Sequence, residues 1–248
     1  MVRYLLLVLF MSNITLNSQN LEQFRSTNWR IFHQLNFADY IDINSNEWKR
    51  LSPQEKKSLM QIPENELKSL TTVALIEIHL NSAYTRSFFL FSEVGEYYNQ
   101  LIHGFNGFNE LINRPDVIDE IIKYYISMNP LEKNVNTAGV EMINQIQFIE
   151  YLIGSPYLVN KFNNSQLNLI IPELIKKYNL KSGNQQIVIE SIESNIYALA
   201  QFLDNNKSFK YNVLNSIDGF VFLKNSGRMS NNTIASALIN LSNNLIGK

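Results

Sequence analysis

Cysteine is absent from this chain of 248 residues. The absence excludes a thiol nucleophile, a thiolate metal site and thiol redox chemistry. It also excludes disulfides, which stabilise many exported proteins. It does not argue against export, however, because a domain of more than about 200 residues can bury enough surface to be stable without them.

Glycine and proline are scarce, at 9 and 6 residues, which leaves little room for the many turns of a β-sandwich. Histidine, the commonest general base, occurs only three times. His79 lies two residues after Glu77, so the two side chains point to different faces of a helix. His103 precedes Gly104 at an expected helix end, where the helix dipole favours an imidazolium. We interpret these two histidines and His33 as structural residues.

Recognisable catalytic motifs are missing as well. The sequence contains no nucleophile elbow, zinc-protease helix, Walker loop or glycine-rich dinucleotide turn. We therefore expect no metal and no other cofactor. The charge is nearly balanced, with 21 basic and 22 acidic residues, so a nucleic-acid or membrane-surface partner is not expected.

The apolar run at the N-terminus, from Tyr4 to Met11, is too short to be a membrane span, which needs roughly 20 apolar residues. It follows Arg3 and precedes a polar stretch, which is the order of a secretory signal peptide. We predict a signal peptide over residues 1–18, cleaved after Ser18, and export to the periplasm or the exterior with no transmembrane span remaining. The alternative interpretation is a first core helix.

Helix signals become regular after an irregular N-terminal arm, residues 19–50, and predict a single helical domain over residues 51–248. Ser52, Pro53 and Glu55 are the N-cap, the first-turn proline and the acidic N3 residue of a capping box. Further helix starts are expected at Ile62-Pro63-Glu64, at Thr71 or Thr72, and at Ser92-Glu93.

Apolar spacing predicts the later helices. One buried stripe consists of Ile192, Ile196, Leu199 and Leu203, and a second has the same spacing from Ile234 to Leu245. Only Phe220 to Leu223 could be extended, as a short strand. The expected helix stops are Gly104, Pro130, Gly154, Gly183 and Gly227.

Two pairs of segments resemble each other within the chain. Leu111 to Pro115 is similar to Leu152 to Pro156 at an offset of 41 residues, and Ile118 to Lys123 is similar to Ile171 to Lys176 at an offset of 53. The difference predicts one short inserted helix near Tyr157 to Phe162. The fold is thus predicted to be all-α, either stacked helical hairpins in a HEAT-like irregular solenoid or a plain helical bundle.

The segment Gly104 to Asn109 contains the tripeptide Gly-Phe-Asn twice. Its three-residue spacing places Phe105 and Phe108 on one side of a turn, close in sequence to Tyr97 and Tyr98. One interpretation is a stacking platform that binds a sugar or a peptide through these four aromatic residues. The other is a tight turn between helices with buried rings, since clustered aromatics in helical proteins commonly form core.

Two pairs of acidic residues share helix faces through three-residue spacing: Glu93 with Glu96, and Glu190 with Glu193. Such pairs could begin a metal or glycosidase site if other segments supply partners. A solvated acidic face explains them equally well.

One set of residues in the first half comprises Gln61 to Glu64, Leu67, Ser69 to Thr72, Ala74-Leu75, Phe105 to Leu111, Arg114 and Asp116. This set resembles the helical N-terminal module of exported proteins common in Bacteroidota, over about residues 50–130. In longer members this module precedes a segment with a hydrolase-like Cys-His pair, which this cysteine-free chain does not have. The resemblance implies an exported helical module and no chemistry.

The sequence favours a non-catalytic binding or scaffolding module of the cell envelope or exterior, with a protein or a glycan as partner. Export, the expected stacked helices and the missing catalytic motifs carry this hypothesis. The alternative is a carboxylate-dependent hydrolase of a glycan or peptide, with Glu93, Glu96 or Glu190 as its acids.

Overall fold

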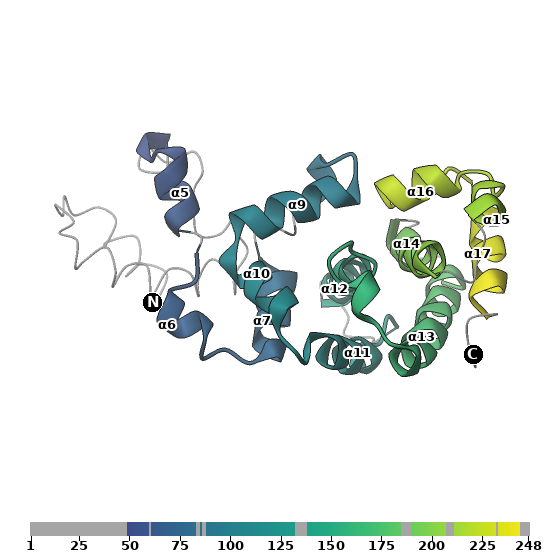
Figure 1. The fold of residues 1–248 in the computed structure, drawn as a ribbon, viewed down its shortest axis with the longest axis horizontal. Coiled ribbons are helices and arrows are strands. Elements are labelled where there is room, and N and C mark those ends of the chain that lie inside the picture. Colours follow the sequence, from purple (N-terminus) through teal and green to yellow (C-terminus); the bar gives the residue numbers. More distant parts are fainter. Residues whose placement is uncertain are drawn as a thin grey trace.

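The computed structural model describes residues 49–59, 61–82, 85, 88–131, 138–184, 190–206, 211–231 and 233–243. Every regular element in these ranges is a helix, so the all-α prediction is confirmed (Figure 1). No described helix is both long and apolar enough to cross a membrane. The predicted signal peptide and nearly all of the predicted arm lie outside the described residues.

The first half of the described chain contains six α-helices and a 3-10 turn. α10 packs on both α7 and α9, and α11 packs on both α7 and α10. In order, the elements are α5 (Pro53–Leu59), α6 (Glu64–Leu67), α7 (Thr72–Asn81), η1 (Phe88–Leu90), α9 (Val94–Gly104), α10 (Asn106–Asn113) and α11 (Val117–Ser127).

The second half is arranged around one central helix, α14 (Glu190–Asn205), which packs on α12, α13, α16 and α17 (Figure 1). α12 also contacts α7 and α11 and so joins the two halves. The other elements are α12 (Ala138–Ile153), η2 (Val159–Lys161), α13 (Asn164–Ser182), α15 (Tyr211–Asn215), α16 (Phe220–Ser226) and α17 (Thr233–Asn243).

Most of the predicted helix starts are correct in detail. The Ser52 N–H donates to Glu55 Oε2 at 2.7 Å and the Glu55 N–H donates to Ser52 Oγ at 3.2 Å, which is the predicted capping box. The Thr71 hydroxyl accepts from the Ala74 N–H and caps α7. At α9 only the position is right, because its N-cap, Glu93, makes no side-chain capping bond.

The stretch from Phe220 to Leu223 is helical and not a strand, which corrects the sequence-based interpretation. Gly219 and Gly227 take left-handed conformations, with φ of 81° and 71°, and turn the chain at both ends of α16. Phe220 and Leu223 then lie one turn apart on the same buried face. Two glycines that bracket a short segment are thus helix boundaries here.

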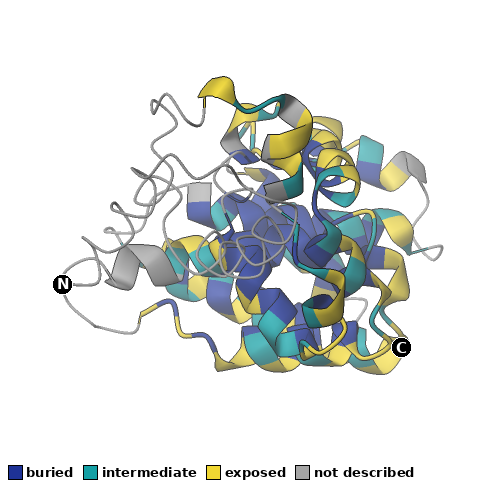
Figure 2. Ribbon diagram, turned by 90° about the vertical axis from the view of Figure 1, so that its left-hand side faces the viewer, coloured by how far each residue is buried: buried dark blue, intermediate teal, exposed yellow. Residues whose placement is uncertain are grey.

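The buried side chains form one continuous hydrophobic cluster that reaches from Ile62, before α6, to Leu238 in α17. Figure 2 shows this buried layer inside a shell of exposed residues. The predicted stripe of α14 is part of it, since Ile196, Leu199 and Leu203 are fully buried. Packing against α12, α13 and α17 therefore determines which face of α14 turns inward.

The similar segments lie in two helix pairs, α10 with α11 and α12 with α13, but Ile118 is near the start of α11 whereas Ile171 lies well inside α13. Leu111 and Leu152 are both fully buried near helix ends, at the end of α10 and of α12. The turn η2 lies inside the segment where the insertion is predicted. The pairs differ in length, however, because α10 has 8 residues and α12 has 16. An internal duplication thus stays a prediction.

Side chains in the loop before α6 and in the turn between α9 and α10 hold the N-terminal helices together. Asn106 accepts the Ile62 N–H at 2.9 Å and donates to the Ile62 carbonyl at 2.7 Å. In return, Gln61 accepts the Asn106 N–H and donates to the Gly104 carbonyl, both at 2.8 Å. The four bonds satisfy two backbone groups of the loop before α6 and two at the ends of α9 and α10, which would otherwise be left unpaired.

Two further bonds link α6 and α7 to the loop between α10 and α11. The Thr72 hydroxyl donates to Asp116 Oδ1 at 2.7 Å, and Arg114 Nη2 donates to the Leu67 carbonyl at 3.3 Å. Several residues that carry the sequence resemblance are therefore partners of one another. Their observed contacts are structural.

Candidate functional site

The four aromatic residues proposed from the sequence as a stacking platform lie in the hydrophobic core. Tyr97 is 3% exposed, Tyr98 and Phe105 are 1% exposed, and Phe108 is fully buried. Tyr98 stacks on Phe108 with a centroid distance of 5.5 Å, and Tyr97 meets Tyr98 edge-on at 4.8 Å. This is the placement of the alternative interpretation, a turn with buried rings.

The turn leaves no space for a ligand between these rings. Phe105 has an extended backbone between α9 and α10, and its ring lies against Gly107, where an added Cβ would be 2.4 Å from Phe105 Cζ. His79 is also buried, with its ring 5.2 Å from that of Phe108. Burial raises the pKa of the Tyr97 and Tyr98 hydroxyls.

The two acidic pairs differ in their exposure to solvent. Glu93 and Glu96 are both exposed, and the Ser92 hydroxyl donates to Glu96 Oε2 at 3.3 Å. The side chain of Glu190 lies outside the described part of the structure. Glu193 is buried, and its Oε1 accepts the Met229 N–H at 2.8 Å.

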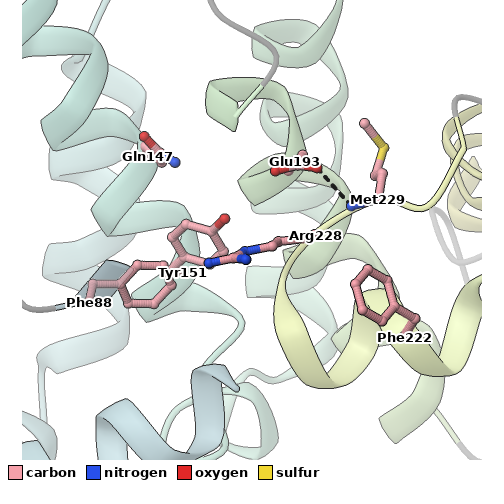
Figure 3. A pocket seen from close by; sticks show the side chains of 7 residues that line it. All are labelled: Phe88, Gln147, Tyr151, Glu193, Phe222, Arg228 and Met229. Atoms are coloured by element: carbon pink, nitrogen blue, oxygen red, sulfur yellow. Dashed lines mark hydrogen bonds between the residues drawn. The ribbon is translucent and has the colours of Figure 1, made fainter. Parts of the chain in front are cut away.

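Glu193 lines a cleft of about 430 Å³ that opens where α12, α14 and α16 meet (Figure 3). Its volume is within the range of small-molecule and peptide side-chain pockets. The cleft has an aromatic side from η1 and α12, a carboxylate from α14, and a third side from α16 and the loop after it. The lining residues are Phe88, Gln147, Tyr151, Glu193, Phe222, Arg228 and Met229.

Three contacts fix the shape of the cleft. The Tyr151 hydroxyl donates to the Gly227 carbonyl at 3.1 Å, and the Tyr151 ring lies 4.4 Å from that of Phe88. The bond from Met229 to Glu193 anchors the same loop on α14. Gly227 permits this approach, because an added Cβ would be 2.7 Å from Tyr151 Cε1 and 2.8 Å from Val94 Cγ2.

The cleft carries charges of both signs. Burial is the main cause that raises the pKa of the Tyr151 hydroxyl, and the nearby Glu193 raises it further, while Arg228 acts in the opposite direction. The guanidinium of Arg228 has no ion-pair partner among the described residues. In Figure 3 it points from the loop after α16 toward the side of the cleft that Tyr151 and Phe88 line.

A buried ionic network lies beside the cleft, because Glu150 precedes Tyr151 on α12. The fully buried Glu150 carboxylate accepts from Lys181 Nζ at 2.8 Å, from the Tyr125 hydroxyl at 2.6 Å and from Asn195 Nδ2 at 2.7 Å. The Ser194 hydroxyl is a fourth donor. Four helices, α11 to α14, thus meet on one carboxylate.

Lys177, on α13 like Lys181, is a second cation beside the network. Lys177 lies 4.8 Å above the centroid of the Tyr125 ring and pairs with Glu173 at 2.9 Å. Its ammonium also donates to the Met128 carbonyl. Burial lowers the pKa of Lys181, and its ion pair with Glu150 acts against that shift.

Neither the network nor the cleft is among the sequence-based predictions. One signal could have indicated the network: Ile170, Leu174, Lys177 and Lys181 have the same i, i+4, i+7, i+11 spacing as the buried stripe of α14. A lysine in such a stripe implies a buried partner. The cleft has no comparable signal, because its residues come from four separate segments.

No group of three or more acidic or histidine side chains is placed to hold a metal ion within the described ranges. No family model, curated protein or solved structure matches this chain.

Proposed function

We propose that this protein is an exported, non-catalytic binding module of the cell envelope or exterior, and that its ligand occupies the cleft beside α14. The cleft is the observation that supports the proposal most directly. It offers a half-exposed ring, Phe222, together with a cation, Arg228, on a framework fixed by hydrogen bonds. Concave, largely apolar sites with few polar groups are typical binding sites.

A hydrolase is less well supported by the same geometry. Carboxylate-dependent glycoside hydrolysis uses two carboxyl groups about 5 to 10 Å apart across the substrate. Glu193 is the only carboxylate among the seven lining residues, and one of its oxygens accepts a backbone N–H. Glu150, its acidic neighbour in the core, already has four hydrogen-bond donors.

Export is supported by the N-terminal charged, apolar and polar order of the sequence. The resemblance to exported helical modules of Bacteroidota agrees with it. Fractionation of the host, followed by N-terminal sequencing of the protein, tests this part. We expect the protein outside the cytoplasm with Gln19 first; an intact N-terminus in the cytoplasm would refute export.

The binding role is tested by immobilising the purified protein and passing peptide and glycan fractions of the host envelope over it. We expect retention by the original protein, and loss of retention after Phe222→Ala. Leu169→Ala on α13 is the matched control, because Leu169 is also about half exposed but does not line the cleft. Turnover of a fraction, with equal retention by all variants, would contradict the proposal.

A further inference from the structure

Arg228 gives the cleft a specific requirement. Its guanidinium lines the cleft and has no ion-pair partner among the described residues, although Glu193 lines the same cleft. A guanidinium binds a carboxylate in a planar, bidentate geometry that a lysine cannot reproduce. We infer, on the basis of the proposed binding function, that the cleft binds a peptide through a carboxylate adjacent to a large apolar side chain.

The apolar part of this ligand has its own contact surface. Phe222 is 51% exposed, and Phe88 and Met229 complete an apolar lining. A methionine adapts its shape to different side chains, and an exposed aromatic ring gains most from contact with another large apolar group. Arg228 and Phe222 both line the cleft, so a carboxylate and a side chain of neighbouring ligand residues could contact both.

A glycan matches this lining less well, because the polar groups of the cleft are largely engaged within the protein. The Tyr151 hydroxyl donates to Gly227, and a Glu193 oxygen accepts from Met229. Gln147 also interacts with another group of the protein. Sugar hydroxyls need several unengaged donors and acceptors, whereas a carboxylate next to an apolar side chain needs chiefly the guanidinium and the apolar lining.

The test measures binding of the full purified protein to fluorescent hexapeptides by polarisation. One set ends in Phe, Leu or Met with a free carboxylate, a second has the same sequences amidated, and a third is amidated but carries Asp or Glu beside the apolar residue. We expect binding of the first or the third set and not of the second. Comparing the binding of the first set with that of the third shows whether the protein recognises a C-terminal carboxylate or an acidic side chain.

Variants then connect binding to the cleft. We expect Arg228→Gln to weaken binding about tenfold or more, and Arg228→Lys to restore only part of it. Added salt should weaken binding of the original protein more than that of Arg228→Gln. The matched control is Lys176→Gln, which removes one positive charge from an exposed side chain on α13.

The outcomes separate this inference from the proposed function. Equal binding of carboxylate-bearing and neutral peptides, or equal binding by Arg228→Gln, overturns the carboxylate requirement. Retention of glycans alone, lost in Phe222→Ala, overturns the peptide ligand and leaves the binding role standing. No retention of peptides or glycans by the original protein overturns both.

Discussion

Lys181 and Glu150 are both fully buried and form an ion pair at 2.8 Å. Removing one partner of a buried pair leaves an uncompensated charge in the core, which costs about 3–5 kcal/mol. Lys181→Met should therefore lower the free energy of unfolding by about 3 kcal/mol, measured by chemical denaturation. The Lys181→Met, Glu150→Gln double variant should lose less than the sum of the single changes.

A neighbouring lysine is the control for this change. Lys176 lies on the same helix and also pairs with a glutamate, but its side chain is mostly exposed. Exposed pairs contribute about 1 kcal/mol or less, so Lys176→Met should be nearly neutral. Equal losses from the two substitutions would show that the ion pair of Lys181 has no special weight.

Gly227 combines two requirements that only glycine meets. Its φ of 71° is left-handed, and an added Cβ would be 2.7 Å from the ring of Tyr151. Gly227→Ala should lower the free energy of unfolding by about 1–2 kcal/mol or more, because the left-handed conformation alone costs that much for other residues. The substitution should also weaken ligand binding, because the added Cβ would displace the Tyr151 ring and the carbonyl that accepts its hydrogen bond.

Gly95 provides the opposite case. It lies in the first turn of α9, and an added Cβ would meet nothing within 4 Å. Gly95→Ala should raise the free energy of unfolding by about 0.5–1 kcal/mol through helix propensity. Thermal unfolding of both alanine variants checks the pair of predictions, and loss of stability in both would refute the steric explanation.

Polar side chains also stabilise the boundaries of the helices. The doubled Gly-Phe-Asn segment allows two such asparagines to be compared within one protein. Asn106 satisfies both the N–H and the carbonyl of Ile62, whereas Asn109 is exposed and, among the described residues, accepts only from Asn113. Asn106→Ala should cost about 1–3 kcal/mol, the desolvation penalty of unpaired backbone groups. Asn109→Ala, measured by the same denaturation experiment, should cost well under 1 kcal/mol.

The sequence predicted the elements best where the cause is local. The capping box at Ser52, the cap at Thr71 and the glycine stops depend on residues within one helical turn, and the structure confirms them. The prediction of a strand at Phe220 was wrong, because four residues are too few to distinguish the side-chain period of a strand from that of a helix. Whether the flanking glycines end a strand or a helix depends on packing against α14 and α15.

The candidate site could not be predicted in this way, since its residues come together only through the fold. Phe88 and Arg228 are 140 positions apart in sequence, and no spacing rule connects them. The sequence instead drew attention to Phe105 and Phe108, which are conspicuous in composition but fully or almost fully buried. Dense local aromatics thus indicated core, while the cleft combines residues from four separate segments.

At the scale of the whole molecule, burial of tyrosine dominates the alkaline response. The pKa is raised chiefly by burial at Tyr98, Tyr125, Tyr151, Tyr197 and Tyr97. An unfolded chain loses these protons near pH 10, whereas the folded protein retains them to higher pH. Above about pH 10 the unfolded chain therefore binds fewer protons, and the free energy of unfolding falls as pH rises.

Lys181 acts with the opposite sign, because its lowered pKa lets the folded protein lose a proton before the unfolded chain does. Five tyrosines outweigh one lysine, so we expect a net loss of stability between about pH 9.5 and about pH 11.5. Denaturation at several pH values, with tyrosinate absorbance as a second probe, measures it. A level or rising free energy of unfolding over this range would refute the expectation.

Tyr97→Phe isolates one contribution to that slope. The Tyr97 hydroxyl is buried and has no hydrogen-bond partner within the described structure, so phenylalanine keeps the packing and removes an unsatisfied polar atom. At pH 7 the variant should be as stable as the original protein, or up to about 1 kcal/mol more stable. Above pH 10 its stability should fall less steeply, because one tyrosine no longer titrates in the unfolded chain. If the free energy of unfolding fell equally steeply in both proteins above pH 10, burial would not raise the pKa of Tyr97.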